Sequence, residues 1–396
     1  MLTYKQLFLE HLGQTSPFPM LIEIVRAEGI YLYGPDNKKY IDLISGVSVS
    51  NTGHGNPSIV RAVQEQAEKY MHLMVYGEYV QSPQVEYASK LAELLPPALD
   101  SVFFVNSGSE AVEGALKLAK RFTGRTGIIS FKSAYHGSTH GAMSIQGSEQ
   151  FRNAFRPLLP DTHLIAFNDF DALGSINHNT ACVIIEPVQA EAGVIYPVSG
   201  FLEAVRKRCD ETGSLLIFDE IQTGFGRTGH LFAIEKFRVV PDILLLAKAL
   251  GGGMPLGAFI SSREIMSSLS VNPVLGHITT FGGHPVCCAA GMASLEFLLQ
   301  KKLVDNCLVQ SDIFKLNLKH KLIKEIRGEG LLLAVQLTDS EYVKKAVANA
   351  PKYGLILDYF LFCSDAFRIA PPLIITKEES LTACRLITEL LDSLLE

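Results

Sequence analysis

At residues 215–224 the chain reads LLIFDEIQTG. The first four residues are apolar without a break, and the acidic Asp219 follows them directly. A short apolar run of this kind is typical of a strand buried on both faces of a parallel sheet. A carboxylate at the end of such a strand is costly unless a cation meets it. We therefore expect a buried strand here, with either the protonated ring nitrogen of a ligand or an Arg or Lys side chain at Asp219.

Four other apolar runs lie in the middle of the chain, separated by stretches of helical periodicity. They are Val102–Val105, Gly127–Phe131, Ala181–Ile185 and Ile243–Ala247. Strands that alternate with helices predict an α/β fold, with a large domain built on a mostly parallel central sheet. Ligands of such sheets bind beyond the carboxyl ends of the strands. The residues directly after each run are therefore the first candidates for a functional site.

The two ends of the chain have a different pattern. Residues 29–34 and 39–43 alternate around a Pro-Asp-Asn turn, which predicts a β-hairpin. After about Gly291 come helical patterns, a strand-like Leu331–Leu337 and a last helix from about Lys377. These ends predict a smaller α+β domain beside the large one. The expected N-terminal part of the small domain, the large domain and the C-terminal part of the small domain are residues 1–52, 53–290 and 291–396.

Length and composition narrow the classes of function. Hydrophobic residues make up 47% and charged residues 19% of the 396 residues, as in a folded globular protein. A net charge of −6 without a long basic run argues against a nucleic-acid partner. No apolar stretch approaches the ~18 to 20 residues of a membrane span, and the first residues lack a secretory signal. The seven cysteines have no metal-ligand spacing, so we expect reduced thiols, no metal and a cytoplasmic location.

The apolar run that ends at Val105 leads into Asn-Ser-Gly-Ser-Glu and then into a helical pattern. Ser107, Gly108 and Ser109 are small, so a ligand can approach the backbone closely. A helix N-terminus offers free N–H groups and the positive end of the helix dipole, which together bind an anion such as phosphate. The other interpretation of this segment is an ordinary serine-capped helix.

The run that ends at Ala247 leads directly into Lys248, and three glycines follow at 251–253. A lysine at the end of a buried strand is partly desolvated, which lowers its pKa and favours the neutral amine that imine chemistry needs. Alternatively, its stem lies along the strand end and its ammonium group reaches water. A phosphate cradle, a carboxylate for a ring nitrogen and an amine for an aldehyde are together what pyridoxal phosphate requires. The three segments therefore predict a pyridoxal-phosphate site.

With these segments in view, the sequence resembles the class III (ω-) aminotransferases of fold type I, and within them the acetylornithine and ornithine aminotransferases. The likeness extends from about Gly29 to the C-terminal helix. The matching motifs are FVNSGSEA at 104–111, YHG at 135–137, IEP at 185–187, FDEIQTG at 218–224, AK at 247–248, TFGGHP at 280–285 and RIAPPL at 368–373. The resemblance implies the pyridoxal-phosphate-dependent transferase fold type I and an enzyme that transfers amino groups.

The resemblance also implies a role for each residue around the cofactor. Lys248 would hold pyridoxal phosphate through an imine bond and would move a proton during transamination, while Asp219 would keep the ring nitrogen protonated. Gln222 would hydrogen-bond the ring hydroxyl, and Tyr135 and Ile221 would lie on the two faces of the ring. The remaining cofactor-binding positions implied by the motifs are Ser107, Gly108, Ser109, His136, Glu186 and Thr280.

Two positions concern the substrates. Arg368 matches the arginine that receives the α-carboxylate of 2-oxoglutarate or glutamate, and a guanidinium suits bidentate carboxylate binding. Glu191 matches the acid that shields this arginine while an ω-amino donor is bound. A surface ion pair is the other interpretation of Arg368. Thr280 would complete the phosphate site from a second subunit, which implies a homodimer with shared active sites.

The donor is less defined, because Ser138 stands where relatives acting on ornithine or acetylornithine carry an arginine for the donor's α-carboxylate. A hydroxyl does not replace a charged bidentate contact. We expect ornithine or an N-acylornithine as donor, with lysine, 4-aminobutyrate, a diamine or a β-amino acid as alternatives. A second interpretation is an aminomutase or a decarboxylating transaminase on the same fold. A third is a non-enzymatic binder on the same fold, which would be expected to have lost Lys248, Asp219 or Gln222, or a nucleotide-binding protein. The latter is disfavoured because the glycines at 251–253 do not form a G-x-G-x-x-G turn.

Overall fold

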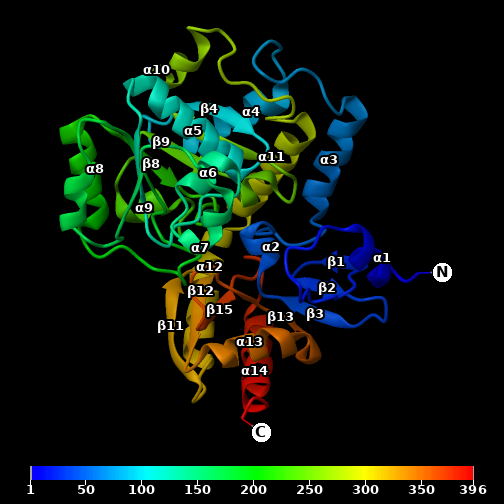
Figure 1. Cartoon of the computed structure of the whole chain (residues 1–396). Coiled ribbons are helices and arrows are strands. Elements are labelled where there is room, and N and C mark those ends of the chain that lie inside the picture. The colour runs from blue at the N-terminus through cyan, green and yellow to red at the C-terminus, as the bar shows by residue number, and fades with distance from the viewer. Residues whose placement is uncertain (1, 396) are drawn as a thin grey trace.

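The structure, a computed structural model, describes residues 2–395. A seven-stranded sheet, the central sheet, forms the middle layer of the larger part of the molecule, the upper part in Figure 1. Its strands are β4 Ser101–Val105, β5 Gly127–Phe131, β6 Thr162–Ile165, β7 Thr180–Ile185, β8 Leu215–Asp219, β9 Ile243–Leu246 and β10 Gly257–Ser261. The strand order is β4-β10-β9-β8-β7-β5-β6, and only β10 runs antiparallel to its neighbours. The predicted α/β fold with a mostly parallel sheet is therefore confirmed.

All five predicted apolar runs are strands of this sheet, namely β4, β5, β7, β8 and β9. Strands β6 and β10 were not predicted from the sequence. Strand β6 lies at the sheet edge and is only partly buried, so it lacks a continuous apolar run. Strand β10 is fully buried, but its five residues begin with Gly257 and end with Ser261, which hides the pattern.

Helices cover both faces of the central sheet. Helix α5 (Gly108–Thr123) is capped by Ser107 and ends at Gly124, whose φ of 68° suits a left-handed C-terminal cap. Its buried side, which includes Ala111 and Ala115, packs against one face of the sheet. Helices α8 (Phe201–Thr212) and α11 (Pro285–Gln300) lie in the core on the other face. Helices α3 and α4, at Pro57–Lys69 and Ser82–Leu94, pack against α11.

The two ends of the chain meet in a second group of elements, below the central sheet in Figure 1. One sheet has the order β1-β2-β3-β13, with bounds Arg26–Glu28, Tyr31–Tyr33, Lys39–Asp42 and Leu355–Ile356. The predicted hairpin is the antiparallel pair β2 and β3, and β13 adds to β3 in parallel. The other sheet has the order β11-β12-β15-β14, with bounds Ile323–Glu329, Leu332–Leu337, Ala366–Ile369 and Asp358–Tyr359. The longer helices here are α1 Tyr4–His11, α12 Leu303–Asn317, α13 Ser340–Asn349 and α14 Lys377–Asp392.

A left-handed helical turn, α2 (Ser45–Ser48), follows the hairpin. Its four φ angles are 45°, 62°, 61° and 65°, and the third belongs to the β-branched Val47. Such a backbone is strained for a residue of this shape. The turn persists because Asp42 Oδ1 accepts hydrogen bonds from two successive backbone N–H groups at 2.9 and 2.8 Å. The Ser45 hydroxyl also donates to the carbonyl of Ala370 at 2.7 Å, which ties the turn to the C-terminal sheet.

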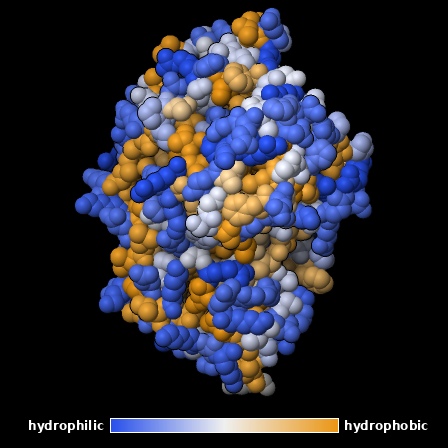
Figure 2. All heavy atoms as spheres, turned by 90° about the vertical axis from the view of Figure 1, so that its left-hand side faces the viewer, coloured by the Kyte–Doolittle hydropathy of each residue, from blue (hydrophilic) through white to orange (hydrophobic). Residues whose placement is uncertain are grey.

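The surface mixes hydrophilic and hydrophobic residues, as the face shown in Figure 2 illustrates. Among residues 2–395, none of the helices combines the length and the apolar character needed to cross a membrane. The same residues contain no group of three or more His, Cys, Asp or Glu placed to hold a metal ion. All seven cysteines are unpaired, and six of them are buried, as their scattered positions predict.

Candidate active site

A cavity of about 500 Å³ opens at the carboxyl ends of the central strands. Its wall is formed mainly by the residues that follow β4, β5, β7, β8 and β9, the edge at which sheets of this kind bind ligands. The predicted cofactor residues that line it are Ser107, Gly108, Ser109, Tyr135, His136, Glu186, Asp219, Ile221, Gln222 and Lys248. The fold therefore brings together segments that are more than 140 positions apart in the sequence, from Ser107 to Lys248.

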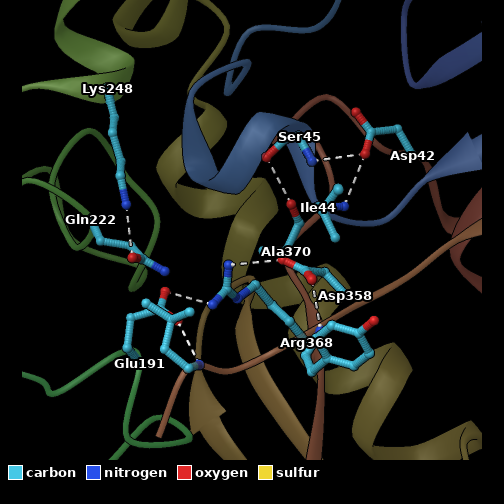
Figure 3. A network of polar contacts seen from close by, with 11 residues as sticks. Asp42, Ile44, Ser45, Glu191, Gln222, Lys248, Asp358, Arg368 and Ala370 are labelled. Atoms are coloured by element: carbon cyan, nitrogen blue, oxygen red, sulfur yellow. Dashed lines mark hydrogen bonds and ion pairs between the residues drawn. The ribbon is translucent and has the colours of Figure 1, made fainter. Parts of the chain in front are cut away.

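Lys248 begins a short 3₁₀ helix, η3 (Lys248–Gly251), directly after β9. Its Nζ donates a hydrogen bond to Gln222 Oε1 at 2.8 Å, as Figure 3 shows. Desolvation lowers the pKa of Lys248 to about 8, and the negative charge of Glu191 opposes this shift. The neutral amine, which can attack an aldehyde, is therefore far more populated near neutral pH than for a lysine with the ordinary pKa.

Asp219 ends β8 and is 4% exposed. Its Oδ2 lies 2.7 Å from Nδ1 of His136, and its Oδ1 accepts a hydrogen bond from the backbone N–H of Ile221 at 3.1 Å. Within residues 2–395, no Arg or Lys forms an ion pair with this carboxylate, so the structural alternative considered for Asp219 is not found. The buried Asp219 side chain instead remains available to a cation bound in the cavity.

The N-terminus of α5 forms another part of the wall. The Ser107 hydroxyl accepts a hydrogen bond from the backbone N–H of Glu110 at 3.2 Å and so caps the helix. Ser107 also lines the cavity, so both interpretations of this segment hold. A Cβ at Gly108 would lie 2.9 Å from Ile221 Cδ1, and a Cβ at Gly137 would overlap the Ser109 hydroxyl. The glycines thus allow close packing around a helix end that can hold a phosphate.

Glu186 organises the segment after β5. One of its oxygens accepts a hydrogen bond from the backbone N–H of Tyr135 at 3.0 Å, and the other accepts one from Ala190 at 3.2 Å. Burial and the nearby charge of Asp219 raise the pKa of Glu186 well above its usual value. Glu186 therefore fixes the backbone that presents Tyr135 to the cavity.

The residues present fit pyridoxal phosphate. Nε2 of Gln222 is buried and has no hydrogen-bond partner among the described residues, and it belongs to the side chain that contacts Lys248. A buried donor without a partner is uncommon in a folded protein, so a ligand oxygen is expected there. The same cavity provides an amine, a buried carboxylate and a helix N-terminus, which match the aldehyde, ring nitrogen and phosphate of this cofactor.

Arg368 and Glu191 lie beside this cavity rather than in its wall. Arg368 projects from β15 and is 1% exposed, so a surface ion pair does not describe it. Its Nη2 donates to Glu191 Oε1 at 2.6 Å, and Figure 3 shows the pair next to Lys248 and Gln222. The second oxygen of Glu191 accepts the backbone N–H of Leu361 at 3.1 Å. A buried cation is thus covered by a buried carboxylate, both of whose oxygens accept hydrogen bonds.

Two further predicted residues, Ser138 and Thr280, also lie outside the cavity wall. Ser138 is exposed, and its hydroxyl is 3.3 Å from the hydroxyl of Tyr135. Thr280 is exposed and does not line the cavity, so its predicted contact with the phosphate is not seen within this chain. The sequence reasoning missed Val49, which the left-handed turn places in the wall, and Asp358, which lies beside Arg368. Neither has a signal in the sequence, because both positions depend on how the chain ends pack.

Residues 13–391 match the model of the family described as Aminotransferase class-III. The acetylornithine aminotransferase of Methanopyrus kandleri is 40% identical over 372 residues, which are 93% of each chain. The putrescine aminotransferase of Pectobacterium atrosepticum is 40% identical over 366 residues, which are 88% of this chain and 77% of that one.

Solved structures agree with this family. The ornithine aminotransferase of Toxoplasma gondii superposes with a TM-score of 0.90 at 31% identity and covers 98% of this chain and 94% of that chain. The acetylornithine aminotransferase of Elizabethkingia anophelis superposes with a TM-score of 0.85 at 33% identity over 98% of both chains. A second structure of the Toxoplasma enzyme has pyridoxal phosphate at partial occupancy in its active site.

Proposed function

The chain belongs to the class III aminotransferases, which depend on pyridoxal phosphate, and we propose that it moves an amino group from an ω-amino donor to 2-oxoglutarate, giving glutamate. The observation that carries this proposal is the buried contact between Arg368 and Glu191 beside Lys248. A single cation that can be covered and uncovered suits an enzyme that binds first a donor without a carboxylate near the reacting amine and then a 2-oxo acid. The same contact favours a two-substrate aminotransferase over an aminomutase.

The bound cofactor supplies a ring that withdraws electrons from the substrate carbon. Around it, Lys248 would hold the aldehyde carbon and later accept and return a proton at Nζ. Asp219, oriented by His136, would keep the ring nitrogen protonated, and Gln222 would donate from Nε2 to the ring hydroxyl. The residues proposed to complete the cofactor site are Tyr135 and Ile221 on the two ring faces, Glu186 behind Tyr135, Ser107, Gly108 and Ser109 at the phosphate, and Thr280 from a second subunit.

For the donor we propose an ornithine or N-acylornithine first, because several curated relatives at about 40% identity carry the name acetylornithine aminotransferase. A diamine is the second candidate. It is favoured by Ser138, whose exposed hydroxyl cannot bind a carboxylate as an arginine would, and by the putrescine aminotransferase among the relatives. Lysine, 4-aminobutyrate and β-amino acids complete the range of ω-amino donors.

A half-reaction screen tests this proposal. The protein loaded with pyridoxal phosphate is mixed with one amino donor at a time, without a 2-oxo acid, and the absorbance of the bound cofactor is followed until it becomes that of the pyridoxamine form. Conversion by ornithine or an acylornithine supports the first donor, and conversion by a diamine alone supports the second. The amine-loaded protein is then mixed with 2-oxoglutarate. A cofactor that fails to return to its first form would contradict the proposed acceptor, and Lys248→Ala serves as the inactive control.

We also propose that the chain acts in the cytoplasm as a homodimer and is divided into the parts 1–52, 53–290 and 291–396. The exposed position of Thr280 supports the dimer, because this residue does not line the cavity of its own chain and is open to a second subunit. The pairing of β13 with β3 supports a small domain built from both ends of the chain. Analytical ultracentrifugation tests the dimer, since a monomer with full activity would exclude a shared site.

A further inference from the structure

Arg368 has a second carboxylate beside it. Asp358 belongs to β14 and lies directly opposite Arg368 in the antiparallel pair that β14 forms with β15. Its Oδ2 is 3.7 Å from Nη1 of Arg368, whereas Glu191 contacts Nη2 (Figure 3). The two acids therefore approach different nitrogens of one guanidinium.

The two carboxylates are held in different ways. Glu191 makes a short charge-assisted hydrogen bond of 2.6 Å, whereas the 3.7 Å separation of Asp358 is too long for a hydrogen bond and leaves only the attraction of charges. Asp358 is fixed by its strand, and its Oδ1 accepts the backbone N–H of Tyr359 at 2.8 Å. The orientation of the guanidinium comes from Glu191 and from the ring of Phe360, whose centroid lies 4.7 Å from Cζ. Asp358 therefore helps to neutralise the guanidinium of Arg368 but does not orient it.

Arg368 needs a counter-charge whenever Glu191 leaves it. The side chain is 1% exposed, and a buried guanidinium without a partner is strongly unfavourable. The Asp358 side chain is 30% exposed; burial raises the pKa of its carboxyl, and the charge of Arg368 opposes that rise and favours the ionised form. Asp358 is thus placed to neutralise Arg368 in the state in which Glu191 has moved away.

We propose that Asp358 is a permanent counter-ion of Arg368 that limits how tightly this arginine holds the carboxylate of the acceptor. This inference rests on the proposed role of Arg368 in binding 2-oxoglutarate. With the acceptor bound, two carboxylates share one guanidinium, and their repulsion weakens binding and speeds release of the amino-acid product. Asp358 therefore acts through the charge of Arg368 and sets acceptor affinity without touching the reacting atoms.

The test has to separate two effects of removing the charge. Asp358→Asn strengthens the attraction of Arg368 for the acceptor, but it equally strengthens the attraction for Glu191, which the acceptor displaces. The comparison is therefore made in the Glu191→Gln background, where the competing charge is absent. The Kd for 2-oxoglutarate is measured from the single-turnover reaction of the amine-loaded enzyme.

We expect the double variant Glu191→Gln/Asp358→Asn to bind 2-oxoglutarate roughly tenfold more tightly than Glu191→Gln alone. Asp358→Glu, which keeps the charge, should leave the affinity within about threefold of the parent. A purely structural role predicts weaker binding in both Asp358 variants, so an unchanged or raised Kd in the double variant would overturn the inference. The donor half-reaction of each variant reports whether the site has remained intact.

Arg368→Met distinguishes failure of the inference from failure of the proposed function. This variant should lose most of its affinity for 2-oxoglutarate. If it does, and Asp358→Asn still fails to tighten binding in the Glu191→Gln background, only the role of Asp358 is wrong. If Arg368→Met binds 2-oxoglutarate as tightly as the native protein, Arg368 does not bind the acceptor. Both the proposed function and the inference about Asp358 would then be wrong.

Discussion

Because its amine is desolvated, Lys248 should react with pyridoxal phosphate at a rate that depends on pH. Its pKa is lowered to about 8, and only the neutral amine attacks an aldehyde. In cofactor-free protein, the rate at which pyridoxal phosphate is captured should therefore rise with pH up to about 8 and then level off. Stopped-flow absorbance at a series of pH values measures this rate. A rate that keeps rising beyond pH 10 would show a lysine with its ordinary pKa, and Lys248→Ala should show no covalent capture at any pH.

At Arg368 the shape of the cation matters as well as its charge. We expect Arg368→Lys to raise the KM for 2-oxoglutarate roughly tenfold to a hundredfold, because a lost charge-assisted hydrogen bond typically costs about 1.5–3 kcal/mol. The KM for the amino donor should change by less than about threefold. Arg385→Lys is a suitable control, since Arg385 pairs with Glu389 on the exposed side of α14. An equal rise in both KM values would contradict a separate acceptor contact.

At the scale of elements, the contact between helix α5 and the segment after β5 depends on Gly137. Its φ is 124°, and a Cβ there would overlap the hydroxyl of Ser109 at the start of α5. Gly137→Ala should therefore cost at least about 1–3 kcal/mol and weaken the binding of pyridoxal phosphate. Gly174→Ala is the matched control, because it has open space around it. Melting temperature and cofactor Kd are the measurements, and equal behaviour of the two variants would refute the proposed close contact.

The sequence predicted those elements whose burial appears as an apolar run, and it missed those whose position depends on packing against distant parts of the chain. Strands such as β8 are buried on both faces, so their apolar runs are visible in the sequence itself, and Asp219 and Lys248 follow directly. Strand β10 gave no such run because it is short and bounded by Gly257 and Ser261. Asp358 could not be predicted, since its place beside Arg368 comes from the register of β14 on β15, which local pattern does not specify.

For the whole molecule, a shared site predicts complementation between subunits. Lys248→Ala removes the amine from its own subunit's site, whereas Thr280→Ala removes a phosphate contact from the partner's site. A mixed dimer of the two variants has one site with neither residue and one site with both. We expect this dimer to bind pyridoxal phosphate in one site with native affinity, and its activity should be about half that of the native dimer. Fluorescence titration and steady-state assays after subunit exchange would measure this, and no recovery beyond Thr280→Ala alone would exclude Thr280 as a shared residue.

The parallel pairing of β3 with β13 joins Ile41 to Leu355. A chain leaving the ribosome therefore cannot complete this sheet until about 355 of its 396 residues have been synthesised, because β13 is the last of the four strands of this sheet to emerge. Sheets that pair strands so far apart in the sequence form late, and the strands synthesised first remain exposed until their partners are available. The edge of β3 that pairs with β13 therefore stays open during most of synthesis, and a chain truncated before Leu355 would leave it permanently without its neighbour.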